Sequence, residues 1–179
     1  MNILGDNALY PIAAFDFDGT LSLNGRCPDI QGTPRQWARQ VLNFLVNIGV
    51  KVVIWTNRDS SMDGKSFEFD DITEMMKWFQ EYDINYSSIN ESYQFAPYHY
   101  KARKIFAHRF VDDRAYGFDS SNEDILLDVL EEFLVKILRL DNMLASRIRS
   151  QILFSDDHDV DKEIIDECKK YIKEQWTIS

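Results

Sequence analysis

The sequence predicts an α/β fold with a central parallel sheet, and two features of the chain carry this prediction. Apolar stretches typical of buried strands alternate with amphipathic helices between residues 12 and 113. Strand–helix alternation of this kind is typical of parallel sheets, which place functional residues at the carboxyl ends of their strands. Three of the predicted strands end in polar residues, namely Asp16 with Asp18, Thr56, and Asp112 with Asp113.

Local sequence indicates the first strand and the helix that follows it. The apolar segment 12–17 (IAAFDF) is predicted as a buried strand, and residues 19–33 are predicted as a loop. Thr33 suits a helix N-cap and Pro34 suits the first helical position. Because apolar residues then recur at helical spacing over 37–48, we expect a helix that begins at Pro34.

The rest of the predicted core continues the alternation. Residues 50–56 are apolar and β-branched, which predicts a second buried strand. A helix is expected over 71–82, a weak strand near 84–89, and another strand over 108–113. The order of these elements is typical of a parallel sheet with crossover helices, and we expect a Rossmann-like three-layer sandwich with this sheet at its centre.

The C-terminal part of the chain has a different pattern, which predicts a helical extension. An apolar stripe at helical spacing runs over 126–148, and a last helix is expected over 161–176. We therefore divide the chain into a core over 1–120 and a helical segment over 121–179. This segment could pack on the core, act as a lid, or form the interface of a homo-oligomer.

Composition limits the classes of partner. The chain has 179 residues and a formal net charge of −10, and residues 118–179 carry 15 acids against 8 bases. Binding over a large surface to nucleic acid or to an anionic membrane relies on clustered Lys and Arg, so neither is expected. Cys27 and Cys168 are predicted to be free thiols. With no signal peptide and no long apolar run, we expect a cytoplasmic protein without a membrane span.

The acids at the strand ends predict a metal site. Residues i and i+2 of an extended segment point the same way, so Asp16 and Asp18 are expected to project together. Two close carboxylates repel each other unless a cation or a shared proton compensates. Mg²⁺ prefers carboxylate oxygens, water and substrate phosphate, and Asp112 and Asp113 could complete its oxygen shell. Taken alone, Asp18-Gly19 could also be a simple turn, and Asp112-Asp113 a solvated one.

The same residues resemble the motifs of the haloacid dehalogenase (HAD) superfamily. "DFDGT" at 16–20 resembles its first motif, and "VVIWT", which ends in Thr56, resembles its second. "FVDD" at 110–113 resembles its acidic fourth motif. The third motif is one basic residue upstream of that strand, for which Lys104 is the first choice and Lys101 the alternative. The resemblance covers residues 11–114 in order and spacing.

This resemblance implies an HAD-type phosphatase. Asp16 would attack phosphorus as the nucleophile, and Asp18 would act as general acid and then as general base. Mg²⁺ would be held by Asp16, by the backbone carbonyl of Asp18 and by Asp112, with Asp113 beside them. Thr56 and Lys104 would hold the phosphate. Asn57 and Arg58 are expected to contact substrate. Arg58 and Arg114 each follow a strand end, so either could touch substrate, and for both a solvated arginine is the favoured alternative.

The spacing between motifs leaves no room for a substantial cap domain, so the chain resembles the small capless members of the superfamily. An open site suits a bulky phosphorylated substrate, either a small molecule or a nucleotide or nucleic-acid end. A rival interpretation is a non-catalytic HAD-like binding module that acts through its C-terminal helices. The Asp16 and Asp18 pair argues against this rival, because a binding protein needs no acid–base residue.

Overall fold

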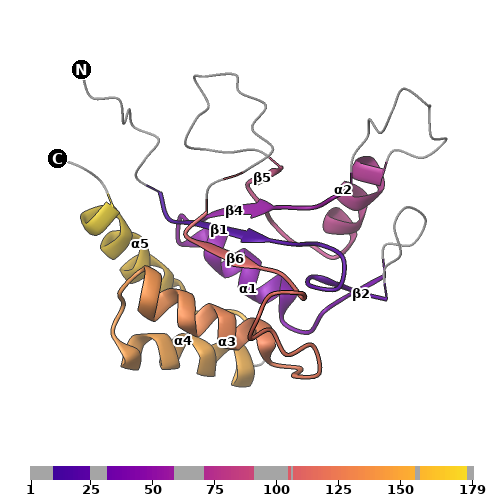
Figure 1. The fold of residues 1–179 in the computed structure, drawn as a ribbon. Coiled ribbons are helices and arrows are strands. Elements are labelled where there is room, and N and C mark those ends of the chain that lie inside the picture. Colours follow the sequence, from indigo (N-terminus) through magenta and orange to yellow (C-terminus); the bar gives the residue numbers. More distant parts are fainter. Residues whose placement is uncertain are drawn as a thin grey trace, which may run out of the picture.

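A four-stranded parallel sheet forms the centre of the protein. The computed structural model describes residues 10–24, 32–58, 71–90, 105, 107–155 and 158–176. In this part of the chain the strand order is β5-β4-β1-β6, and β1 lies between two parallel neighbours (Figure 1). The strands are β1 (Ile12–Phe15), β4 (Lys51–Ile54), β5 (Ser88–Ile89) and β6 (Arg109–Val111). The predicted α/β fold with a central parallel sheet is confirmed.

The register of the sheet aligns three strand ends. Phe15 of β1 pairs with Ile54 of β4 and with Val111 of β6. One residue further on, the Asp16 amide donates to the Val111 carbonyl at 2.8 Å, and the Trp55 amide donates to the Phe15 carbonyl at 2.8 Å. The residues that follow β1, β4 and β6 therefore emerge together at one edge of the sheet.

Both faces of the sheet are buried. Ala13 and Phe15 of β1 belong to the main hydrophobic core, whereas Ile12 and Ala14 face a second cluster that also contains Val53. All five side chains are at most 1% exposed. Alternate residues of one strand are thus apolar on both sides, which explains the continuous apolar runs in the sequence.

The helices pack against the main core of the sheet, and those after residue 120 form the C-terminal segment. They are α1 (Ala38–Asn47), α2 (Asp71–Glu81), α3 (Ile125–Glu132), the π-helix η2 (Phe133–Ile137), α4 (Asn142–Phe154) and α5 (Lys162–Trp176). Buried residues of α1, α3, α4 and α5 belong to the same core cluster as β1 and β4. The C-terminal helices therefore pack on the core. None of the helices in the described ranges has the length and apolar character needed to cross a membrane.

Two boundaries differ from the sequence-based expectation. Thr33 and Pro34 do not begin a helix, because they form β3 (Thr33–Pro34), which pairs antiparallel with β2 (Ser22–Leu23). Proline lacks an amide donor, so it is as compatible with a short edge strand as with a helix start. α1 instead begins after Trp37, which has a φ of 67°.

The apolar stripe over 126–148 is also not one helix. Arg139 has a φ of 60°, which ends the first helical stretch after η2. A second helix then starts at Asp141, whose side chain accepts a hydrogen bond from the Leu144 amide at 2.9 Å. The chain reverses between α3 and α4, so the stripe is shared by two packed helices.

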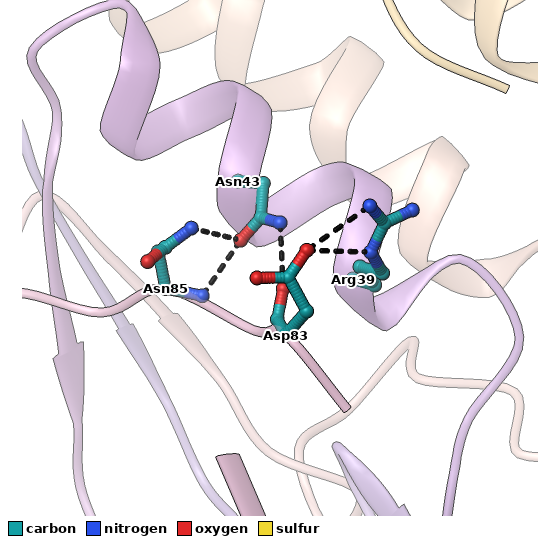
Figure 2. A network of polar contacts seen from close by, with 4 residues as sticks. All are labelled: Arg39, Asn43, Asp83 and Asn85. Atoms are coloured by element: carbon teal, nitrogen blue, oxygen red, sulfur yellow. Dashed lines mark hydrogen bonds and ion pairs between the residues drawn. The ribbon is translucent and has the colours of Figure 1, made fainter. Parts of the chain in front are cut away.

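A polar network fixes α1 to the connection between α2 and β5 (Figure 2). Asp83 accepts from Arg39 Nη2 at 3.1 Å through its side chain, and from Asn43 Nδ2 at 2.8 Å through its carbonyl. Asn43 Oδ1 in turn accepts from the backbone amide of Asn85 at 2.6 Å. This network holds the chain that leads into β5 beside the first crossover helix.

Candidate active site

Three carboxylates gather at the aligned strand ends. Asp16 follows β1, and Asp112 and Asp113 follow β6; each offers an oxygen atom within 4.8 Å of those of the other two. All three side chains are half-buried. The sequence-based prediction that acids from distant parts of the chain meet at this edge is therefore confirmed for these three residues, and they could hold a metal ion.

The electrostatics of this acid cluster call for a cation. The pKa of Asp16 is raised from 3.8 to about 7, mainly by burial and also by the negative charges of Asp112, Asp18 and Asp113, against the lowering effect of a hydrogen bond from the Phe17 amide. Burial and the neighbouring Asp112 also raise the pKa of Asp113. A hard dication would favour the charged forms, and its preference for carboxylate oxygens fits this all-oxygen donor set.

The loop after β1 is shaped around Asp113, which accounts for the Gly-Thr of the first motif. Gly19 has a φ of +83°, and a Cβ atom at this position would lie 2.8 Å from Asp113 Cγ. The hydroxyl of Thr20 accepts a hydrogen bond from the Asp113 amide at 2.7 Å. Only glycine permits both this backbone conformation and this close approach. The β1 loop and the β6 loop are therefore locked together at the acid cluster.

Arg35 reinforces this junction, and sequence reasoning missed it. Its buried guanidinium donates to the carbonyls of Gly19 at 2.6 Å, Thr20 at 2.9 Å and Ser120 at 3.2 Å. It also lies over the Phe118 ring at 5.3 Å. Because its partners are backbone carbonyls, which every residue has, no motif in the sequence could have indicated this role.

Asp18 is not one of the three clustered acids, and its carboxylate pairs with Arg58. Arg58 Nε donates to Asp18 Oδ2 at 2.8 Å, and Arg58 Nη2 donates to Asp18 Oδ1 at 2.6 Å. The arginine side chain is 1% exposed, whereas that of Asp18 is 32% exposed. The guanidinium also lies over the Phe17 ring, 5.0 Å from its centroid. Asp18 remains close enough to act on the charge of Asp16, but its carboxylate is engaged by a bidentate pair.

The other predicted substrate-binding residues differ in their surroundings. Thr56 is buried, and its hydroxyl accepts from the Arg58 amide at 3.1 Å. Its backbone amide and carbonyl are both bonded to the side chain of Asn90, at 2.9 Å each. Asn57 is exposed. Asn90 was not predicted, and its position directly after β5 gives no sequence signal.

The basic residue of the third motif is not located by the structure. Lys104, the first choice, and Lys101, the alternative, both lie outside the described residues. Their assignment to the site therefore stays a prediction.

The comparisons with known proteins add evidence on the fold. No family model matches the chain, and no curated protein matches it. A solved structure, described as a conserved protein coded by a locus from Bacteroides thetaiotaomicron, matches with a TM-score of 0.52 and 23% sequence identity. The match covers 71% of this chain and 92% of that one. At this identity the match concerns the fold alone, and it agrees with the α/β architecture.

Proposed function

We propose that this protein is a Mg²⁺-dependent phosphohydrolase that cleaves a phosphomonoester through an aspartyl-phosphate intermediate, in the manner of HAD-type phosphatases. The observation that carries the proposal is the cluster of Asp16, Asp112 and Asp113 at the carboxyl edge of a parallel sheet. Asp16 stands directly after the central strand, where open α/β sheets bind their ligands. The DFDGT motif supplies the second acid, Asp18.

The chemistry consists of two displacements at phosphorus. A carboxylate oxygen of Asp16 attacks phosphorus, the bond from phosphorus to the ester oxygen breaks, and that oxygen takes a proton from Asp18 as the alcohol leaves. Water then attacks the aspartyl-phosphate and gives a proton back to Asp18, which releases inorganic phosphate and restores the Asp16 carboxylate. Oxygens of Asp16 and Asp112 would hold the Mg²⁺ ion, which would neutralise negative charge between the nucleophile and the phosphoryl group.

Residues around the acids have supporting roles in this proposal. Thr56 keeps its hydroxyl hydrogen for a phosphate oxygen, because its Oγ1 accepts rather than donates in the bond with the Arg58 amide. Arg58 was expected to contact substrate, but its bidentate pair with Asp18 supports a positioning role instead. Because both Asp18 oxygens accept from Arg58 in this pair, Asp18 must release at least one of these hydrogen bonds before it exchanges a proton with the leaving group.

The proposal is tested by phosphate release from a panel of phosphomonoesters by the full chain with Mg²⁺. We expect turnover that is lost on chelation and on the substitution Asp16→Asn. Asp166→Asn is the matched control, because Asp166 is exposed on α5. If the folded protein releases no phosphate from any ester in the panel, the proposal is wrong and a non-catalytic binding module becomes the better interpretation.

A further inference from the structure

The loop that follows the metal-site acids is ordered along its length. Ala115 donates its amide to the Asp112 carbonyl at 2.9 Å, and Arg114 donates its amide to Asp112 Oδ1 at 2.8 Å. At the far end of the loop, the Phe118 amide donates a hydrogen bond to the Ala115 carbonyl at 3.1 Å, and the Phe118 ring lies under Arg35. The loop is therefore held at both ends and presents its side chains from a fixed backbone.

Two side chains of this loop are exposed and, among the described residues, form no hydrogen bond or ring contact. The Tyr116 side chain is fully exposed to solvent, at 108% of its reference area. Arg114 is exposed, and within the described ranges its guanidinium has no hydrogen bond or ion pair, although its charge acts on Asp113. Trp55, on the other side of Asp16, differs because it packs against Phe110 at 5.2 Å between ring centroids. Packing explains Trp55 but explains neither Tyr116 nor Arg114.

Their position beside the acid cluster indicates what they could bind. Arg114 directly follows Asp113, and Tyr116 lies two residues further along the same fixed loop. The loop leaves β6 at the sheet edge where the three acids meet, so a leaving group that projects outward from Asp16 could reach it. An exposed aromatic ring next to a cation matches a nucleoside, because every base offers a flat face for stacking and the cation attracts the phosphate.

We propose that Tyr116 and Arg114 determine specificity for a nucleoside monophosphate, with the base stacked on Tyr116 and Arg114 close to the phosphate. This inference rests on the proposed phosphohydrolase function and names its substrate class. A mononucleotide fits better than a nucleic-acid end, because residues 118–179 carry 15 acids against 8 bases and repel a long polyanion.

The decisive comparison is between adenosine 5′-monophosphate and ribose 5-phosphate, which share the phosphoester and differ in the base. We expect kcat/KM to be about 5- to 100-fold higher for the nucleotide, the range that stacking of one base supplies. Tyr116→Ala should remove this preference and leave ribose 5-phosphate within about twofold, whereas Tyr116→Phe should keep it. Phe154→Ala, which removes another exposed ring (81% exposed, on α4), should change kcat/KM for neither substrate.

The second specificity residue has its own signature. Arg114→Gln should lower kcat/KM for both substrates by a similar factor, because both carry the phosphate. Arg147→Gln is the matched control: it removes an exposed arginine of α4 and should leave both values unchanged. A 5′-phosphorylated oligonucleotide should be a poorer substrate than the mononucleotide. A higher kcat/KM for the oligonucleotide than for the mononucleotide would overturn the assignment.

Failure of this inference and failure of the proposed function are distinguishable. Equal kcat/KM for the two esters, unchanged by Tyr116→Ala, would overturn the nucleotide assignment and leave the phosphohydrolase standing. Calorimetric binding of adenosine 5′-monophosphate to the Asp16→Asn variant gives a readout without turnover. Binding that Tyr116→Ala weakens, in a protein that hydrolyses no ester, would support the rim site while overturning the hydrolytic proposal.

Discussion

The substitution Asp16→Asn should stabilise the metal-free protein at alkaline pH, because Asp16 is a carboxyl group that folding makes harder to ionise. Its pKa rises from 3.8 to about 7 in the folded state, mainly through burial. The folded protein therefore holds this proton more tightly than the unfolded chain does. The contribution of Asp16 to stability is fully present below pH 3.8 and is lost as the pH rises through about 7.

The size of the effect follows from the same shift. Each tenfold change in proton affinity corresponds to about 1.4 kcal/mol, which gives an upper bound of about 4 kcal/mol for Asp16. Because the group is partly solvated, screening reduces this value, and we expect about 2 kcal/mol. Asparagine has a similar shape and no charge, so the variant should gain this amount at pH 8 and almost nothing at pH 4.

Thermal unfolding in the presence of a chelator measures the effect. For a chain of this size about 2 kcal/mol corresponds to a rise in Tm of about 4–8 °C. Addition of Mg²⁺ should raise the Tm of the unsubstituted protein by mass action and should raise that of the variant much less. Asp166→Asn removes an exposed acid of α5 and should show neither effect. An Asp16→Asn variant that is no more stable than the parent at pH 8 without metal would refute the reasoning.

Three further substitutions test the frame of the site. Arg58→Gln leaves Asp18 without its buried partner and should cost about 2–3 kcal/mol in urea unfolding; adding Asp18→Asn should recover part of this loss, and strict additivity would argue against coupling. Gly19→Ala places a methyl group against Asp113 at a positive φ, so we expect a loss of about 1–2 kcal/mol and weaker Mg²⁺ binding by calorimetry; unchanged values would contradict the close approach. Arg35→Gln removes a buried cation that bonds three carbonyls and should lower stability by about 2 kcal/mol, with retained stability as the contrary result.

The convergence of the metal-site acids could be predicted because it depends on backbone topology. Parallel strands end at one edge of a sheet, and the apolar runs before Asp16 and Asp112 identify two such strands. For this reason the sequence sufficed to bring residues nearly a hundred positions apart into one cluster.

The position of the Asp18 carboxylate could not be predicted in the same way. The rule that residues i and i+2 point together applies to extended chain, but β1 ends at Phe15 and the chain has turned by Gly19, where φ is +83°. Asp18 pairs with Arg58 and is not among the three acids whose oxygens lie within 4.8 Å of one another. A side chain that acts after a strand has ended is placed by tertiary contacts, which local sequence patterns do not encode.

The predicted start of the first helix was wrong because the residues there are compatible with two kinds of local structure. Thr33 and Pro34 match a helix start, but both residues also suit a short edge strand, and pairing with β2 decides between them. The hydrogen bonds of Arg35 to the carbonyls of Gly19, Thr20 and Ser120 then anchor the chain that follows this hairpin. Such long-range contacts are not visible as a local pattern.

A crystal structure of the protein grown near pH 7.5 with Mn²⁺ in place of Mg²⁺ tests the central claim most directly, because anomalous scattering identifies the ion. We predict one strong anomalous peak at the carboxyl edge of the sheet, in contact with oxygens of Asp16 and Asp112. An edge without such a peak at saturating Mn²⁺, with the three carboxylates turned apart, would contradict the account.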